Sequence, residues 1–240
     1  MKIITLASTK GGVGKTTGAV FLAQALAHKG FKTLAIDLDP STALTDFYLR
    51  DETLENLEAR SVLNVLTGTK ALEDCIFHTE LSLSILGATP ELMTFPSRLG
   101  QDPAGITRLR SRLKKLEGFD VCIIDTPPAL GSLLTAGLLA ADLVLTPVSP
   151  HRWVIQAYSL LTRELDSVEE MTGRKPGFKA LFSMVTKGEL ERLQGLGFDA
   201  CLASIPKAAP LAKAVDLGQT LNPKAAVFEY FLELANEVFP

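Results

Sequence analysis

The stretch ASTKGGVGKTTGAV, residues 7–20, decides the fold of this chain. Three glycines precede Lys15, an arrangement typical of a loop whose backbone N–H groups bind phosphate at the start of a helix. In the usual pattern G-x-x-x-x-G-K-[ST], the lysine reaches the β- and γ-phosphates. The first glycine of that pattern would fall at position 9, where this chain has Thr9, and a second lysine, Lys10, follows. The loop therefore predicts phosphate binding and leaves Lys10 to be explained.

The sequence on either side of the loop predicts a β-α-β unit. Residues 2–8, KIITLAS, are apolar and β-branched, which is typical of a buried strand. Residues 14–30 have helical spacing and end at a glycine, and residues 32–40, KTLAIDLDP, read as a second strand that ends in two carboxylates. Such units build parallel sheets through right-handed crossovers.

The same alternation continues along the chain. Further strands are predicted at 81–89, 119–128, 142–150 and 178–186, and helices at 105–118, 151–171 and 223–238. We expect a doubly wound α/β fold with a mostly parallel sheet and helices on both faces. No repeat or linker divides the sequence, so one domain is predicted over residues 1–240, without an N-terminal helix-turn-helix extension.

Composition narrows the class of protein. The chain has 240 residues, 47% hydrophobic and 21% charged, with a net charge of −3, values that suit an ordinary globular domain and exclude a strongly basic one. The three cysteines are far apart, which argues against a disulfide framework or a thiolate metal site. No apolar stretch has the length of a membrane span, so a cytoplasmic location is predicted.

A carboxylate and a hydroxyl complete the predicted site. Asp125 follows the apolar run VCII, at the carboxyl end of a predicted strand, where open α/β sheets bind ligands. It suits the distant carboxylate that holds Mg²⁺ through water, while the Thr16 hydroxyl suits a direct ligand. The order of loop, helix and carboxylate strand predicts a nucleotide-binding site.

Three segments carry a resemblance to a known family. KGGVGKTT at 10–17 resembles the deviant Walker A motif of the ParA/MinD superfamily of P-loop ATPases, DLDP at 37–40 resembles its second acidic motif, and IIDTPPALG at 123–131 its Walker B segment. The similarity continues through 140–150 and 205–215 and covers nearly the whole chain. It implies an ATPase that uses ATP and Mg²⁺, weak alone and stimulated by a partner.

The resemblance also implies residue roles. Lys10 would reach the phosphates of the partner subunit in a nucleotide-sandwich dimer, much as an arginine finger does. Asp39 would orient the attacking water and Asp37 would lie near the metal as an indirect ligand. The catalytic residues are then Lys10, Lys15 and Asp39. The nucleotide-binding residues are Lys10, Gly11, Gly12, Val13, Gly14, Lys15, Thr16 and Thr17.

Two positions depart from the family pattern. Many partition ATPases have a glutamine after the Asp-Pro pair, where this chain has Ser41. Relatives often place an asparagine that reads the adenine edge where this chain has Ser183 and Met184. How the base is read therefore stays open.

The chain most resembles the short partition ATPases that segregate plasmids or chromosomes. In these the ATP-bound dimer binds DNA without sequence preference, a ParB-like partner triggers hydrolysis, and the protein is associated with the nucleoid. Two basic groups are candidates for DNA contact. One consists of Lys207, Lys213 and Lys224, and the other of Arg108, Arg110, Arg112, Lys114 and Lys115.

Other functions of the same loop stay open. A MinD-like membrane-cycling ATPase needs a basic C-terminal amphipathic helix, but Glu229, Glu233 and Glu237 give this helix a negative face, so no membrane partner is predicted. A positioner of a protein assembly would share the partition chemistry. An iron–sulfur carrier lacks support from the cysteine spacing. A metabolic ligase lacks a visible substrate site.

Overall fold

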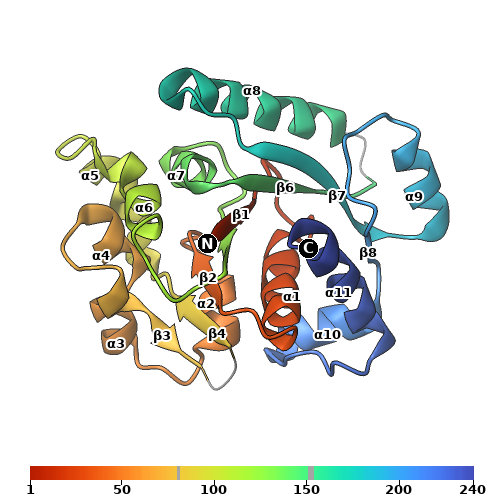
Figure 1. Ribbon diagram of the computed structural model, residues 1–240, viewed down its shortest axis with the longest axis horizontal. Coiled ribbons are helices and arrows are strands. Elements are labelled where there is room, and N and C mark those ends of the chain that lie inside the picture. The colour runs from red at the N-terminus through yellow and green to blue at the C-terminus, as the bar shows by residue number, and fades with distance from the viewer. Residues whose placement is uncertain (80–81, 151–153) are drawn as a thin grey trace.

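The strands form one twisted sheet in the computed structural model, which describes residues 1–79, 82–150 and 154–240 (Figure 1). Within these ranges the sheet has eight strands in the order β3-β4-β2-β5-β1-β6-β7-β8. Their bounds are β1 Lys2–Leu6, β2 Thr33–Asp37, β3 Phe77–His78, β4 Leu83–Leu86, β5 Val121–Asp125, β6 Leu143–Val148, β7 Gly177–Val185 and β8 Ile205–Pro206.

The central strands pair in parallel, which confirms the predicted doubly wound fold. In β1 and β5, Leu6 is the register partner of Asp125, and in β2 and β5 Asp37 is the partner of the same residue. The carboxyl ends of these three strands therefore meet at one edge of the sheet, beside the glycine loop. The edge strand β3 runs antiparallel to β4, which periodicity did not predict.

Helices cover both faces of the sheet. Their bounds are α1 Lys15–His28, α2 Ala43–Tyr48, α3 Leu54–Ala59, α4 Val62–Thr67, α5 Phe95–Arg98, α6 Gly105–Leu113, α7 Ser132–Ala140, α8 Val154–Thr172, α9 Lys187–Gln194, α10 Ala209–Leu217 and α11 Ala226–Val238. Two 3₁₀ turns lie at Glu73–Cys75 and Pro90–Thr94. The sequence reading missed β8, α5, α7, α9 and α10, which are short elements of two to nine residues.

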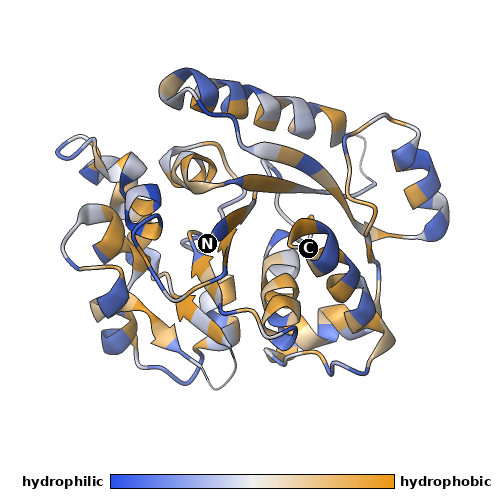
Figure 2. Ribbon diagram, in the orientation of Figure 1, coloured by the Kyte–Doolittle hydropathy of each residue, from blue (hydrophilic) through white to orange (hydrophobic). Residues whose placement is uncertain are grey.

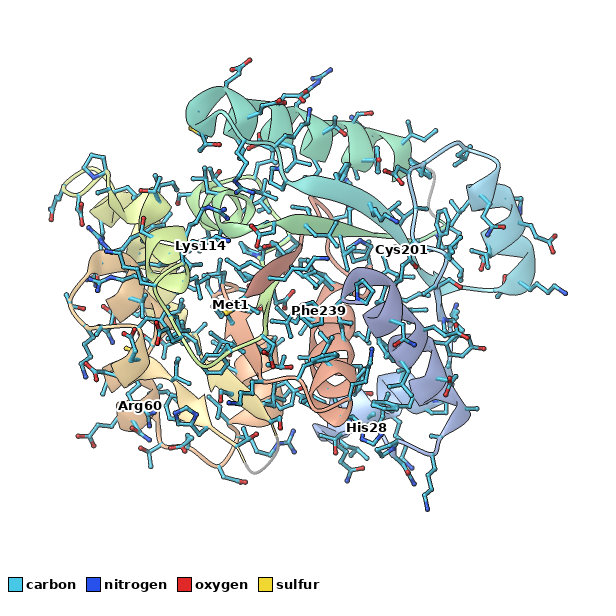
Figure 3. The ribbon with its side chains drawn as sticks, in the orientation of Figure 1. Met1, His28, Arg60, Lys114, Cys201 and Phe239 are labelled. Carbon is cyan, nitrogen blue, oxygen red and sulfur yellow. The ribbon has the colours of Figure 1, made fainter. Side chains whose placement is uncertain are left out.

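Alternation along β1 divides the core between the two faces. Ile4 and Leu6 pack with α1 and α11, while Ile3 packs with residues of α4 to α6. Helix α1 is buried along most of its length and packs beside α11, and both helices share one apolar cluster with the strands of the sheet. Figure 2 shows apolar residues on both helices. His28, at the end of α1, stacks edge-on against Phe228 of α11 (Figure 3). His28 therefore helps to pack α1 against α11.

Candidate nucleotide-binding site

The loop between β1 and α1 has the backbone conformation that its glycines permit. Gly12 and Gly14 have φ of 71° and 85°, in the left-handed region that favours glycine, and Gly14 is the N-cap of α1. A Cβ atom at Gly14 would lie 2.6 Å from Ser183 Oγ, so the end of β7 leaves no room for a side chain there. The shape of the loop therefore depends on its own glycines and on contact with the end of β7.

Lys15, Thr16 and Asp125 come together at the start of α1. The Thr16 hydroxyl donates to Asp125 Oδ2 at 2.6 Å, and Lys15 Nζ lies 3.9 Å from Asp125 Oδ1. Lys15 is 7% exposed and Asp125 is fully buried. The lysine, hydroxyl and carboxylate that the sequence placed in one site are thus neighbours in space, although 109 residues separate Thr16 from Asp125.

Burial raises the pKa of two carboxyl groups at this edge. Burial raises the pKa of Asp125 to about 6, against the opposing effects of Lys15 and Thr16. Burial and the nearby charge of Asp125 raise the pKa of Asp37 to about 7. Two carboxylates of like charge at the ends of adjacent strands favour any cation that lies between them.

Thr45 and two backbone amides hold Asp37 in place. Asp37 Oδ1 accepts from the Asp39 amide at 2.9 Å, and Oδ2 accepts from the Thr45 amide at 2.9 Å and the Thr45 hydroxyl at 2.8 Å. The same hydroxyl accepts from the Ala88 amide at 2.8 Å. Sequence reasoning missed Thr45, because nothing in a lone threonine eight residues after an aspartate indicates this contact.

Asp39 lies next to this network but faces the loop that follows β2. Its side chain is 7% exposed and its Oδ1 accepts from the Ser41 amide at 2.9 Å. This bond is the local turn expected of an aspartate before proline. The hydrogen bond uses Oδ1 of Asp39. The arrangement fits the predicted role in orienting water and equally explains why the turn forms.

The chemistry of these groups fits a magnesium ion held together with phosphate. Asp125 Oδ1 is buried and accepts no hydrogen bond from the residues that the structure describes, so it can accept from a metal-bound water. Within residues 1–79, 82–150 and 154–240, no group of three or more His, Cys, Asp or Glu side chains is arranged to hold a metal by itself. An ion at this edge would therefore depend on Thr16, on waters fixed by Asp125 and on oxygens of the ligand.

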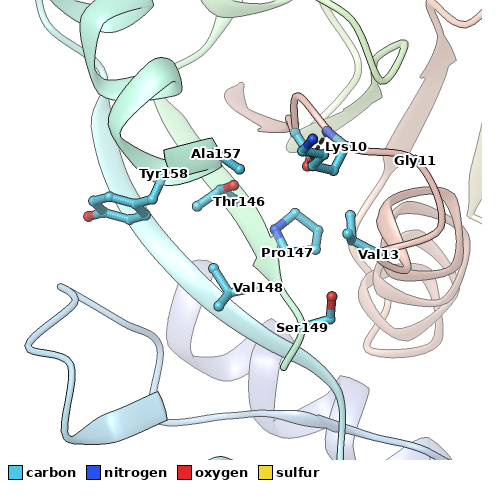
Figure 4. A pocket seen from close by; sticks show the side chains of 10 residues that line it. Lys10, Gly11, Val13, Thr146, Pro147, Val148, Ser149, Ala157 and Tyr158 are labelled. Carbon is cyan, nitrogen blue, oxygen red and sulfur yellow. Dashed lines mark hydrogen bonds between the residues drawn. The ribbon is translucent and has the colours of Figure 1, made fainter. Parts of the chain in front are cut away.

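Lys10 lies on the outer side of the loop. Its side chain is exposed, and its backbone amide donates to Ser8 Oγ at 3.1 Å. Lys10 and Gly11 line a cavity of about 170 Å³ between the loop, the end of β6 and Tyr158 of α8 (Figure 4). The structure thus separates the two lysines, with Lys15 buried beside Asp125 and Lys10 turned to the outside.

The two predicted basic groups differ in their surroundings. In the first group, Lys207 follows β8, Lys213 lies on α10 and Lys224 lies before α11, and all three are exposed. In the second group, Arg110 and Lys114 pair with Asp142 at 3.3 Å and 3.4 Å.

Arg108 of the second group also has structural partners. It pairs with Asp102 at 2.6 Å and donates to the Leu66 carbonyl. Three of the five basic side chains on α6 and its C-terminal end therefore hold the fold together. Figure 3 labels Lys114 at that end of the helix.

The C-terminal helix does not present the regular acidic stripe that its spacing predicted. Glu229 and Glu233 are exposed, but Glu237 is half-buried, pairs with Lys179 at 3.2 Å and accepts from the amides of Leu202 and Ala203. None of the helices in the described ranges is both long and apolar enough to span a membrane.

Comparison with known proteins agrees with the fold and the loop. The family described as an AAA domain (AAA_31) matches residues 1–176. The chromosome-partitioning ATPase Soj of Thermus thermophilus is 32% identical over 98% of this chain and 94% of its own length. The maintenance of carboxysome distribution protein A of Synechococcus elongatus is 35% identical over 72% of this chain and 66% of its own.

A solved structure extends the likeness to the whole fold. Cobyrinic acid a,c-diamide synthase of Mycobacterium smegmatis, with bound ADP and magnesium, superposes with a TM-score of 0.85 at 26% identity, covering 99% of this chain and 94% of that protein. The family match, the Soj similarity and the geometry of the loop agree with one another. This chain therefore belongs to the AAA-domain family of P-loop ATPases, within the ParA/MinD superfamily.

Proposed function

We propose that the chain is a partition-type ATPase that binds Mg²⁺-ATP at the loop of residues 10–17 and hydrolyses it as a dimer. The observation that carries this proposal is the contact of Lys15 and Thr16 with the buried Asp125. The second oxygen of Asp125 has no hydrogen-bond partner among the described parts of the chain. A magnesium ion bound there would neutralise developing charge on the phosphates. The relatives that are partition ATPases support the same activity.

Lys10 acts on the nucleotide of the second subunit in this proposal. Lys15 already supplies a cation inside each subunit, whereas Lys10 is exposed and is free to meet a partner across the loop. A cation that arrives only on dimerisation stabilises the transition state only in the dimer. Hydrolysis and dimerisation are thereby coupled. Asp39 orients the attacking water in each active site.

The dimer binds DNA through phosphate contacts, without sequence preference. The exposed Lys207, Lys213 and Lys224 are the preferred contacts, because the basic side chains around α6 are largely engaged by Asp142 and Asp102. Dimerisation doubles the positive charge on one surface, so binding is strongly salt-dependent. A ParB-like partner bound to the cargo stimulates hydrolysis and returns the protein to the unbound state in the cytoplasm.

The cargo is a plasmid or chromosome in the first instance. A large protein assembly is the second candidate, because a relative that maintains carboxysome distribution is 35% identical over 72% of this chain. The two candidates share the ATPase cycle and differ only in the adaptor that meets the dimer.

The test measures retention of random-sequence duplex DNA without nucleotide, with ADP and with a slowly hydrolysed ATP analogue. We expect retention only with the analogue, and loss of both retention and dimerisation in Lys10→Ala. Lys70→Ala, which removes an exposed lysine far along the sequence from the loop, is the matched control. A Lys10→Ala protein that dimerises and hydrolyses ATP like the wild type would refute the trans role. Dimerisation without DNA retention would refute the DNA assignment.

A further inference from the structure

The short helix α2 lies between the candidate site and α10. It contacts the carboxylate at the end of β2, because the Thr45 amide and hydroxyl both donate to Asp37 Oδ2, at 2.9 Å and 2.8 Å. A helix of six residues is not stable by itself, so the position of α2 depends on contacts of this kind. A ligand that fixes the Asp37 carboxylate therefore also fixes α2.

The junction between β2 and α2 has a strained backbone. Thr42, the N-cap of α2, has a φ of 61°, in the left-handed region, although its side chain is β-branched. Residues with such conformations are maintained by surrounding contacts and cluster at ligand sites and switch regions. The Thr42 hydroxyl donates to Asp46 Oδ2 at 3.2 Å, within the helix. The start of α2 is therefore held by its contacts and responds when the contacts of Asp37 change.

The chain that follows α2 contacts the last turn of α10. Arg50 Nη1 donates to the Leu217 carbonyl at 2.7 Å. Leu217 is the last residue of α10, where backbone carbonyls lack helical partners and the helix dipole favours a cation. Within the described ranges, no other hydrogen bond joins residues 43–51 to α10. Arg50 therefore supplies the polar contact between the α2 segment and α10.

Gly218 provides the room that this guanidinium needs. Its φ is 57°, and it is the C-cap of α10. A Cβ atom added at Gly218 would collide with the guanidinium of Arg50. Both the left-handed backbone and the arginine therefore favour glycine at this position. The close fit indicates a specific contact, even though much of the Arg50 side chain is exposed to solvent.

Helix α10 carries part of the basic surface that we assign to DNA. Lys213 lies on α10 and Lys207 lies just before it, and both are exposed. Beyond α10 the chain is anchored to α1, because the Gln24 amide group donates to the Leu221 carbonyl at 2.6 Å and accepts from its N–H at 3.0 Å. A change in the position of Arg50 therefore acts on α10 itself and is not absorbed by the segment that follows.

We propose that Arg50 is a positioning residue that couples ligand binding at the strand-end carboxylates to the position of α10. A ligand fixes Asp37 and α2, Arg50 then fixes the last turn of α10, and Lys213 is held in the orientation that DNA requires. This inference rests on the proposed function. The coupling operates within one subunit, so it is separate from the contact of Lys10 with a second subunit. Couplings of this kind typically change an equilibrium by roughly 5- to 150-fold.

The experiment measures amide hydrogen exchange in residues 209–218, with and without ADP and Mg²⁺. It uses the wild type, Arg50→Met, Arg50→Lys and the control Arg163→Met, which changes an exposed arginine of α8. We expect the ligand to slow exchange by roughly 5- to 150-fold in the wild type and by less than about twofold in Arg50→Met. Arg50→Lys should recover part of the response, since an ammonium group can also donate to the Leu217 carbonyl. Arg163→Met should respond like the wild type.

Two further measurements accompany the exchange experiment. Calorimetry with ADP establishes that the site of each variant is occupied under the conditions of exchange, and ADP confines the test to one subunit. Retention of random-sequence duplex DNA with a slowly hydrolysed ATP analogue should weaken by roughly 5- to 150-fold in Arg50→Met, although the dimer still forms. A purely structural role of Arg50 would lower stability without removing the response of α10 to the ligand.

The outcomes separate this inference from the proposed function. Equal slowing of exchange in the wild type and Arg50→Met would overturn the inference, because the nucleotide would then act on α10 without the arginine. An unchanged α10 in the wild type saturated with ADP would also overturn it. A response through Arg50 in a protein that retains no DNA would support the coupling and refute the DNA assignment. Failure of ADP to bind the folded wild type would refute the proposed nucleotide site, and with it this inference.

Discussion

Replacement of Thr45 by valine tests the network that holds Asp37 at the edge of the sheet. Valine has nearly the shape of threonine and lacks only the hydroxyl, which donates to Asp37 Oδ2 at 2.8 Å and accepts from the Ala88 amide at 2.8 Å. Thr45 is 1% exposed, so water cannot take the place of the lost group. The variant therefore leaves the Ala88 amide buried and unpaired and removes one of the three donors to the carboxylate.

The free energy of unfolding should fall by about 2 to 4 kcal/mol in Thr45→Val. A buried amide left without an acceptor costs about 1 to 3 kcal/mol, and the lost bond to the carboxylate adds to this cost. Thr45→Ser is the matched control, because it keeps the hydroxyl and loses one methyl group, worth about 1 kcal/mol. The assay is urea unfolding of the protein without nucleotide at neutral pH, followed by far-ultraviolet circular dichroism.

The comparison of the two variants decides the outcome. Valine must be clearly more destabilising than serine, since serine removes the methyl and valine removes the hydrogen bonds. If the two unfolding free energies agree within about 0.5 kcal/mol, the hydroxyl contributes no more than the methyl group and the reasoning about this network is wrong.

Three further predictions concern the phosphate loop, the ion pairs of Asp142 and the pH dependence of stability. Gly14→Ala should weaken ADP binding more than about tenfold, because alanine disfavours a φ of 85° and its Cβ would meet Ser183 Oγ. Calorimetry checks this against Gly188→Ala, where an added Cβ would meet no atom of the described residues within 4 Å. Equal ADP affinities of the two variants would contradict the prediction. Asp142→Ala should lower the free energy of unfolding by about 1 to 3 kcal/mol. The Asp142 side chain accepts from the Ile3 amide and pairs with three basic residues, Arg110, Lys114 and Arg174. An unchanged urea midpoint would show that water replaces these contacts. Burial raises the pKa of Asp37 to about 7 in the folded protein, against 3.8 for a free aspartate. Between these pH values the folded state binds more protons than the unfolded chain. The free energy of unfolding should therefore fall by roughly 2 to 4 kcal/mol as pH rises from about 4 to about 7. Urea unfolding at several pH values should show a shallower slope for Asp37→Asn, and parallel slopes would exclude this carboxyl as the cause.

The pattern of residues along the chain predicted the central fold. Strands that end in glycines or carboxylates and alternate with amphipathic helices require a parallel sheet, and the observed pairing of β1 with β5 and β6 agrees with this. The short elements β3, β8, α5, α7, α9 and α10 were not predicted. Their two to nine residues are held by neighbours rather than by a period of their own.

The candidate site shows the same division between local and distant contacts. Gly12, Gly14, Lys15 and Thr16 form one continuous loop, so their spacing alone indicates a phosphate site. Asp125 could be assigned because it ends an apolar strand. The support of Asp37 by Thr45 depends on the position of α2 relative to β2, which no local pattern encodes.

The sequence by itself determined the phosphate loop, the strand-end carboxylates and the alternation of strands and helices, because each depends on residues close together in the chain and on backbone preferences. Only the tertiary structure decided which basic side chains are engaged by Asp142 and that Ser183 lies over Gly14. These contacts join residues far apart in sequence. They arise from the order in which the strands assemble in the sheet, and that order depends on packing of the whole core rather than on any single segment.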